Sequence, residues 1–218
     1  MTYLGYPNTT GCSFIDYRIV DGETDPAGSE GLCTEKLLRV EGCFLGYALP
    51  NLMPPRQPRS ESGVVLACFN RLQKVSGQTL KMWAVVMNRL PRARLVLKDS
   101  CLSDGPTRAV VAGELQKAGI DPGRVDLLPM DATSEQHLQR LGRADIALDP
   151  YPYHGTTTTC EALLMSTPVV TLAGPAHVAR VGVSILKCCG LDELIADTPE
   201  RYVELVVGLA SDRARLEA

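Results

Sequence analysis

From position 64 onward, short apolar runs alternate with longer amphipathic stretches, and this alternation constrains the fold more than any other feature. The short runs have the composition of buried strands and lie at 64–69, 94–97, 125–128, 145–148 and 169–172. Amphipathic segments typical of helices lie between and after them. Strands that alternate with helices in this way predict an α/β fold: a Rossmann-like open parallel sheet with helices on both faces.

Local signals place the ends of several helices. Apolar residues recur at helical spacing from Thr79 to Leu90, and the pattern stops before Pro91. Thr133 and Gln136 fit the capping-box pattern, which predicts that a helix begins here and runs through position 141. The sequence around 197–199 places proline at the first position of a last helix, where proline is favoured.

Polar clusters follow four of the predicted strands. Ligands of open parallel sheets bind beyond the carboxyl ends of the strands, and all four clusters fall at that edge. They predict one site, built from residues 70–74, 131–140, 150–161 and 174–180.

Bulk properties exclude several classes of protein. A formal charge of −3 leaves no basic surplus for nucleic acid. No apolar run approaches the roughly 20 residues of a membrane span, and the start lacks the pattern of a signal peptide. The eight cysteines form no CxxC pair, which favours reduced, mostly buried thiols and a cytoplasmic protein.

The segment around 145–165 reads as a strand, a loop and the start of a helix. The loop contains Gly155, and a run of threonines from Thr156 leads into the helix. Free N–H groups at a helix N-terminus, with hydroxyls and a glycine beside them, suit a phosphate or diphosphate group. On the local pattern alone the threonines are equally compatible with simple helix capping.

Longer motifs resemble a known family. Residues 144–174 contain DIALDPYPYHGTTTTCEALLMSTPVVTLAG, which is similar to the donor-binding region of the O-linked N-acetylglucosamine (O-GlcNAc) transferase and SPINDLY-like glycosyltransferase family, in its bacterial form. LGYPNTTG, FIDYRIVDGETDP and TEKLLR near the start, and CFNRLQK at 68–74, resemble the same family. The resemblance implies the C-terminal lobe of a GT-B glycosyltransferase, with 1–50 as the tail of the N-terminal lobe, 51–63 as a linker and 64–218 as the UDP-sugar-binding lobe.

The resemblance also implies roles for single residues. Lys74 matches the lysine that holds the leaving UDP and is the expected catalytic residue. Arg71 stands where the family usually has an amide, although a guanidinium could still contact phosphate. His137 and Arg140, which share one helix face, match residues around the uracil base, and the backbone of Ala132 matches a base contact.

Further residues complete the expected site. Thr156, Thr157 and Thr158 would hold the diphosphate, and Glu161 would reach the ribose hydroxyls, in place of an aspartate in animal members. Ser134 replaces a lysine of animal members. The same resemblance places the residues Leu4, Gly5 and Pro7 at the interface between the lobes. Arg180 and Ser184 also match a family segment, but no role is assigned to them.

The expected activity is transfer of N-acetylglucosamine from UDP-GlcNAc to serine or threonine hydroxyls of acceptor proteins, with inversion and without metal or cofactor. The histidines and cysteines show no paired spacing of a zinc site, and no DxD pair is present. The upstream lobe and the tetratricopeptide repeats of the family have no counterpart here, so a fragment is expected. Three alternatives stay open: a GDP-fucose protein O-fucosyltransferase of the same family, a non-catalytic nucleotide-binding fragment, and another Rossmann nucleotide-binding protein.

Overall fold

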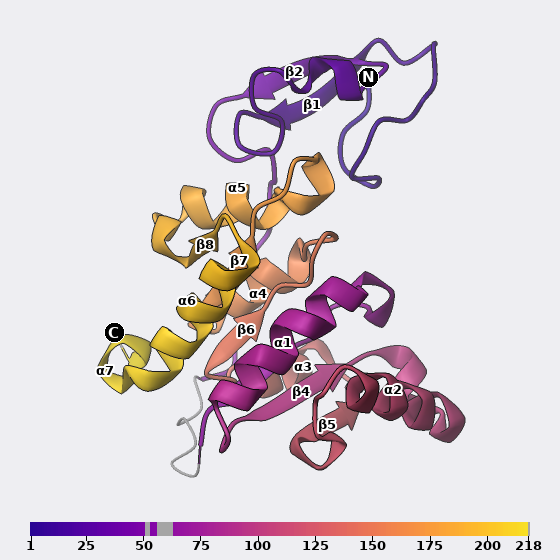
Figure 1. The fold of residues 1–218 in the computed structure, drawn as a ribbon. Helices are drawn as coiled ribbons and strands as arrows, with labels where there is room; N and C mark the ends of the chain where they lie inside the picture. The colour runs from indigo at the N-terminus through magenta and orange to yellow at the C-terminus, as the bar shows by residue number, and fades with distance from the viewer. Residues whose placement is uncertain (51–52, 56–62, 218) are drawn as a thin grey trace.

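The computed structural model describes residues 1–50, 53–55 and 63–217. A six-stranded, entirely parallel sheet forms the centre of its larger part, in the order β5-β4-β3-β6-β7-β8 (Figure 1). The strands are β3 (Val65–Cys68), β4 (Arg94–Lys98), β5 (Val125–Leu128), β6 (Ile146–Leu148), β7 (Val169–Leu172) and β8 (Ile195–Ala196). The predicted Rossmann-like fold is therefore confirmed, and only the two-residue β8 was missed.

Helices cover both faces of this sheet. They are α1 (Gly77–Arg89), α2 (Gly105–Lys117), α3 (Ser134–Leu141), α4 (Thr157–Leu164), α5 (Val181–Cys188), α6 (Pro199–Ser211) and α7 (Arg213–Glu217). α1 packs against α6 on one face, whereas α3, α4 and α5 contact one another in succession on the other (Figure 1). This division follows from right-handed crossovers, because the chain moves outward from β3 in one direction and then returns to fill the other side.

Side-chain caps begin the predicted helices close to the expected residues. Ser76, Thr133 and Thr198 each accept a hydrogen bond from the backbone N–H three residues later. The capping box at Thr133 is modified: Gln136 accepts from the N–H of Ala132 (3.2 Å) instead of from that of the cap residue.

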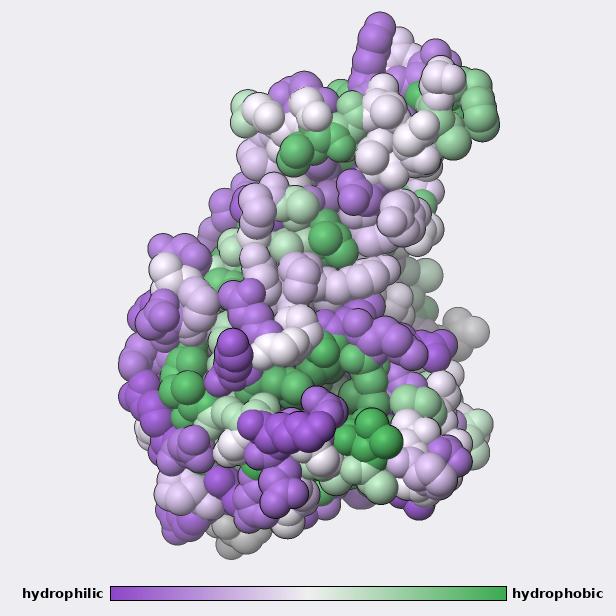
Figure 2. Space-filling view, turned by 45° about the vertical axis from the view of Figure 1, so that its right-hand side comes forward, coloured by the Kyte–Doolittle hydropathy of each residue, from purple (hydrophilic) through white to green (hydrophobic). Residues whose placement is uncertain are grey.

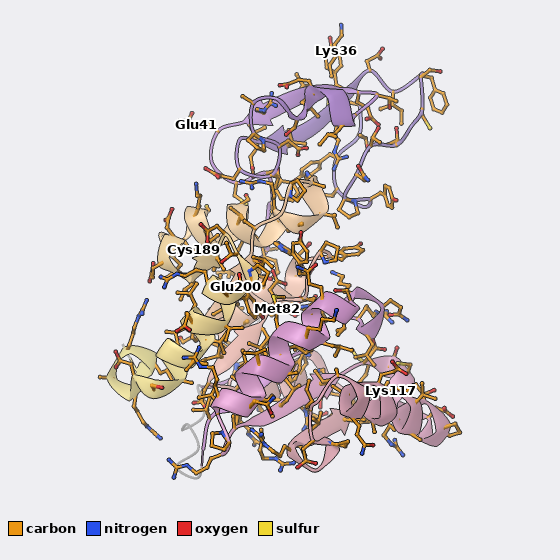
Figure 3. All side chains as sticks on the ribbon, in the orientation of Figure 1. Lys36, Glu41, Met82, Lys117, Cys189 and Glu200 are labelled. Atoms are coloured by element: carbon orange, nitrogen blue, oxygen red, sulfur yellow. The ribbon has the colours of Figure 1, made fainter. Side chains whose placement is uncertain are left out.

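The core holds the only tryptophan. Trp83 of α1 and Tyr202 of α6 are both fully buried, and Trp83 Nε1 donates to the Tyr202 hydroxyl (3.2 Å). That hydroxyl lies 3.3 Å from the Asp149 carbonyl, just beyond β6. The contact between α1 and α6 therefore also supports the loop that follows β6. Figure 3 shows Met82 on the side of α1 near α6, and Lys117 extending from the end of α2.

Residues 1–50 form a smaller segment whose strands β1 (Tyr17–Asp21) and β2 (Lys36–Val40) pair in parallel. Residues 15–20 have the composition of a strand and overlap β1, whereas β2 was not predicted. Apolar side chains such as Phe14 and Leu38 stay exposed on this segment, and Figure 2 shows hydrophobic residues on it above a larger patch on the lower part. A two-stranded sheet is marginal by itself, so its contacts with the larger part matter.

Those contacts are made largely by the region of α5. Ser184 Oγ donates to the buried carboxylate of Asp21, and Arg180 Nε donates to the Glu23 carbonyl (2.6 Å). Burial by itself raises the pKa of Asp21, but hydrogen bonds from Ser184 and from backbone N–H groups lower it overall. Phe44 packs with Val181 and Ile185. Arg180 and Ser184, for which no role was predicted, thus anchor the N-terminal segment.

Two other expectations are settled differently. All eight cysteines are free, but only Cys68 is buried, and Cys188 and Cys189 are exposed. The prediction of mostly buried thiols was wrong, because several cysteines lie in the small N-terminal segment or at the end of α5. The expected linker, 51–63, lies mostly outside the described residues.

Candidate functional site

The strand order of the large sheet reverses between β3 and β6. The chain moves from β3 through β4 to β5, and then returns to the other side of β3 to continue with β6, β7 and β8. Ligands of doubly wound sheets bind at such a switch point, in the crevice outside the carboxyl ends of the two strands. The loops after β3 and β6 contain Lys74 and the threonine run, so topology alone places both at this crevice.

The loop after β6 is held on several sides. Ser76 Oγ and Thr79 Oγ1 donate to the Tyr151 carbonyl (2.5 and 2.7 Å), and the Gly155 N–H donates to Asp149 Oδ1 (2.7 Å). A Cβ added to Gly155 would lie 2.5 Å from Thr158 Oγ1. Glycine is therefore needed here for close packing between the loop and α4.

Below this loop lies a buried pair, Asp149 and His154. The N–H of Gly182 donates to His154 Nδ1 (3.1 Å), so this nitrogen carries no proton, and Nε2 donates to the Leu172 carbonyl (2.9 Å). Burial lowers the pKa of His154 and raises that of Asp149. His154 is thus a neutral structural residue that ties the loop to β7.

A cavity of about 570 Å³, here called the large cavity, opens beside the loops after β3, β4 and β5 and the start of α4. Its walls include most of the site residues predicted from the sequence: Arg71, Lys74, Ala132, His137, Thr156, Thr157, Thr158 and Glu161. Three of the four predicted polar clusters therefore meet. The fourth, at 174–180, contributes His177 to a neighbouring cavity.

A chain of charged and polar contacts forms one wall of the large cavity. Lys98 Nζ donates to Asp131 Oδ2 (2.7 Å) and contacts His137 Nδ1. His137 Nε2 lies 3.0 Å from Glu161 Oε2. Since the ammonium of Lys98 can only donate, His137 Nδ1 is the acceptor, and Nε2 carries the proton that reaches Glu161.

Lys98 lies outside the four polar clusters predicted from the sequence, and Asp131 belongs to the cluster at 131–140 but had no assigned role. The Lys98 side chain is fully buried; burial lowers its pKa, and the ion pair with Asp131 opposes that shift. For Asp131, burial raises the pKa, but hydrogen bonds from Arg140 and Lys98 lower it overall. The signal was present as a lysine at the end of a strand predicted to be buried.

The two predicted arginines behave differently. Arg71 lines the large cavity, and its Nη1 donates to Ser100 Oγ (3.1 Å). Arg140 is not part of the cavity wall, because its guanidinium turns to Asp131, with Nε 2.8 Å from Oδ1. Among the predicted site residues, Arg140 therefore stands behind the wall and supports Asp131.

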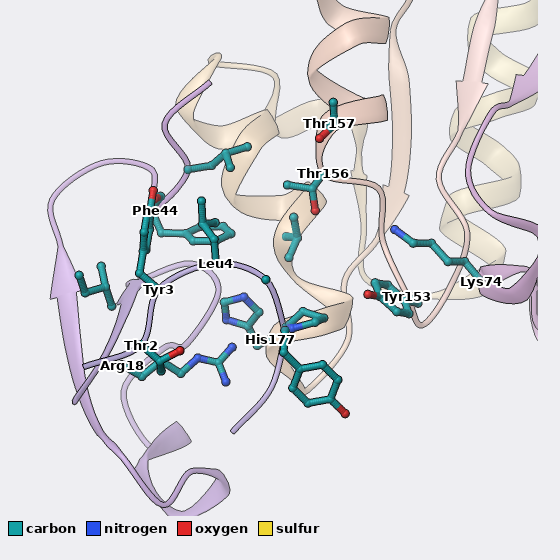
Figure 4. Close-up of a pocket in the computed structure, with 16 residues that line it drawn as sticks. Thr2, Tyr3, Leu4, Arg18, Phe44, Lys74, Tyr153, Thr156, Thr157 and His177 are labelled. Atoms are coloured by element: carbon teal, nitrogen blue, oxygen red, sulfur yellow. The ribbon is translucent and has the colours of Figure 1, made fainter. Parts of the chain in front are cut away.

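A smaller cavity of about 290 Å³ lies between the N-terminal segment and the larger part (Figure 4). Leu4, Gly5 and Pro7 line it. Lys74, Thr156 and Thr157 line this small cavity and the large one. The two cavities thus meet at one lysine and at the first residues of α4.

Lys74 and the start of α4 present positive charge at this junction. Lys74 Nζ donates to the His154 carbonyl (2.7 Å) and lies 4.2 Å from the centre of the Tyr153 ring. Burial lowers the pKa of Lys74. The side chain of Thr156, the N-cap residue of α4, makes no capping hydrogen bond, whereas Thr158 Oγ1 donates to Asn70 (2.9 Å). An uncapped helix N-terminus beside a lysine suits an anionic group.

The described residues contain neither a group of metal ligands nor a membrane-spanning helix. In 1–50, 53–55 and 63–217, no three His, Cys, Asp or Glu side chains are grouped so that they could hold a metal ion. No helix in the same ranges has the length and apolar character needed to cross a membrane.

Comparison with known proteins identifies the family. The model of glycosyl transferase family 41 matches residues 56–218. The chain belongs to this family. Family 41 thus accounts for three quarters of the sequence, including every loop that lines the large cavity.

Individual relatives match almost the whole chain. A probable UDP-N-acetylglucosamine-peptide N-acetylglucosaminyltransferase from Solanum lycopersicum, SPINDLY, is 41% identical over 215 residues, which are 97% of this chain and 23% of the relative. A second probable UDP-N-acetylglucosamine-peptide N-acetylglucosaminyltransferase, SEC from Arabidopsis thaliana, is 29% identical. This match spans 100% of this chain and 23% of SEC. A solved structure of a Thermobaculum terrenum O-GlcNAc transferase variant matches with a TM-score of 0.94 and 36% identity, over 99% of this chain and 41% of that one. This family 41 chain therefore spans about a quarter of the length of SPINDLY and of SEC.

Proposed function

We propose that this chain is the nucleotide-sugar-binding part of a protein O-glycosyltransferase that transfers N-acetylglucosamine from UDP-GlcNAc to serine or threonine hydroxyls. The observation that carries this proposal is the pair of cavities that meet at Lys74, Thr156 and Thr157. A nucleotide sugar has two parts joined by a diphosphate. The large cavity suits the nucleoside, the junction suits the diphosphate, and the small cavity suits the sugar.

The chemistry of the junction supports this assignment. As an acceptor hydroxyl attacks the anomeric carbon, the bond to the diphosphate breaks and negative charge grows on the leaving UDP. Lys74 and the first-turn N–H groups of α4 would stabilise that charge without a metal ion or another cofactor. In the large cavity, Glu161 is an acceptor for the ribose hydroxyls, and His137 and Ala132 lie where the base would bind.

The same proposal includes three partners of this chain: an acceptor protein, an N-terminal catalytic lobe and tetratricopeptide repeats. The names of the relatives support a peptide acceptor, since both describe peptide N-acetylglucosaminyltransferases. A cytoplasmic location is proposed as well, and the eight free thiols support it.

Calorimetry with the purified chain tests the proposal. We expect UDP to bind, GDP to bind more weakly, and His137→Ala to reduce UDP affinity about 5- to 30-fold, because one cavity-wall contact is worth about 1–2 kcal/mol. Gln139→Ala is the matched control on the same helix, since Gln139 bonds Glu135 (3.2 Å) and does not line the cavity. Preference for GDP would favour the GDP-fucose donor instead, and absence of binding by both nucleotides would contradict the proposal.

A further inference from the structure

Arg18 on β1 carries a buried donor without an acceptor. The residue is 4% exposed, and its Nη1 has no hydrogen-bond partner; in the described part of the chain, no other buried side-chain nitrogen or oxygen is in this state. A buried polar group left unpaired costs about 1–3 kcal/mol, and such groups are rare in native proteins. This makes Arg18 a candidate for binding something that the structure does not contain.

The position of Arg18 points to the small cavity. Its backbone is held by the parallel bridge with Thr2, whose N–H donates to the Tyr17 carbonyl (2.7 Å) while Thr2 O accepts from Ile19 (3.0 Å). Arg18 lines the cavity, and Figure 4 shows its guanidinium beside His177, on the opposite side from Lys74. Arg18 therefore belongs to the wall of the small cavity opposite Lys74, with Nη1 buried in that wall.

The surrounding charges indicate which kind of acceptor fits. No ion pair of Arg18 is found within the described part of the chain. Burial raises the pKa of the Cys33 thiol; Arg18 lowers it through its charge and a hydrogen bond, and the charges of Asp25 and Glu35 raise it. Asp25 Oδ2 bonds His177 Nδ1 (2.5 Å). Glu35 is ionised at neutral pH. Burial raises its pKa, but hydrogen bonds from Thr10 and Thr9 lower it to about 2.

Asp25 and Glu35 border the same thiol as Arg18, and their carboxylates would repel an incoming anion. What Nη1 of Arg18 lacks is a hydrogen-bond acceptor. A neutral oxygen, such as a sugar hydroxyl or an amide carbonyl, meets this need.

We propose that Arg18 is a specificity-determining residue for the donor, and that its Nη1 donates a hydrogen bond to a neutral oxygen of the sugar. This inference rests on the proposed function, since the diphosphate at Lys74 brings the attached sugar into the small cavity. At about 290 Å³, this cavity is at the lower end of the range for small-molecule pockets, which suits one sugar ring but not a nucleotide. The contact concerns the sugar alone, so Arg18 separates sugar binding from nucleotide binding.

The test compares dissociation constants for UDP and UDP-GlcNAc, measured by calorimetry on the wild-type chain and on Arg18→Met. We expect UDP affinity to stay within twofold and UDP-GlcNAc affinity to fall about tenfold. Arg39→Met is the matched control: Arg39 lies on the neighbouring strand, bonds the Asp25 carbonyl (2.6 Å) and does not line the cavity. It should leave the ratio of the two constants unchanged. If GDP is the preferred nucleotide, GDP and GDP-fucose replace this pair.

An unchanged ratio in Arg18→Met would overturn the inference, and so would equal weakening of UDP and UDP-GlcNAc, which would assign Arg18 to the fold or to the diphosphate. If Arg18→Met no longer unfolds cooperatively, the ratio of the UDP and UDP-GlcNAc dissociation constants is measured on Arg18→Lys instead. Lysine keeps the positive charge but does not reach the position of Nη1. Failure of the wild type to bind any nucleotide would refute the proposed function and this inference with it. Nucleotide binding with an unchanged ratio would refute this inference alone.

Discussion

Replacement of Lys74 by methionine separates the contribution of its charge from that of its hydrocarbon stem. The ammonium donates to the His154 carbonyl (2.7 Å) and lies over the Tyr153 ring, and no ion pair of Lys74 is found among the described residues. Methionine keeps a similar length and apolar contact. It removes only the positive charge and its donors.

The expected loss can be worked out from this geometry. A hydrogen bond between charged groups contributes about 1.5–3 kcal/mol, which corresponds to a loss of about 10- to 140-fold in UDP affinity. Uridine has no phosphate, so its affinity should not change. Because burial lowers the pKa of Lys74, the folded state already disfavours the ammonium, and we expect stability to fall by no more than about 1 kcal/mol, or about 2–4 °C in Tm.

Calorimetry with UDP and uridine on wild type and Lys74→Met checks this expectation, with thermal unfolding as the test of stability. Lys117→Met is the control, since Lys117 is exposed on α2, pairs with Glu114 (2.7 Å) and lines neither cavity. Equal losses for UDP and uridine would show that Lys74 shapes the cavity and does not bind phosphate. No loss for UDP would refute the diphosphate position altogether.

Three further predictions concern the scaffold. Gly155→Ala should destabilise the protein by about 1–3 kcal/mol and weaken UDP binding, because the new Cβ would lie 2.5 Å from Thr158 Oγ1; chemical unfolding checks this, and Gly208→Ala, where the added Cβ meets open space, should not destabilise. Arg124→Ala should cost about 2–3 kcal/mol in urea unfolding, because the guanidinium bonds three carbonyls around the end of α1; a change under about 0.5 kcal/mol would contradict this. Glu35→Gln should lower Tm at pH 7, and its difference from wild type should shrink as pH falls from about 4.5 towards 2, because the folded-state pKa is lowered to about 2; a difference that stays constant across this range would contradict the assignment.

The secondary structure of the larger part was largely predictable, because its signals are local. β5 and β7 begin and end at the predicted residues, and Thr133 and Thr198 cap the helices that their motifs indicated. The missed strands lack such signals. β2 is mostly exposed, and β8 has only two residues, which pair with β7.

Site residues were predictable where they belong to a loop motif and not where they depend on a distant partner. Lys74, His137 and the threonines of α4 were named from the sequence and line the cavities. Arg140 was named too, but Asp131 draws its guanidinium out of the cavity wall. A helix pattern indicates which face a side chain occupies, and only the folded chain shows which acceptor is nearest.

The sequence by itself determined the class of fold, the edge of the sheet at which the two cavities open, and the family, since these depend on local periodicity and on contiguous motifs. Tertiary structure alone decided that two cavities meet at Lys74. It also buried Lys98 behind His137 and left Arg18 of β1 facing the small cavity without an acceptor. These features join residues far apart in the chain, and burial and pairing at such distances arise only when the strands and helices pack together.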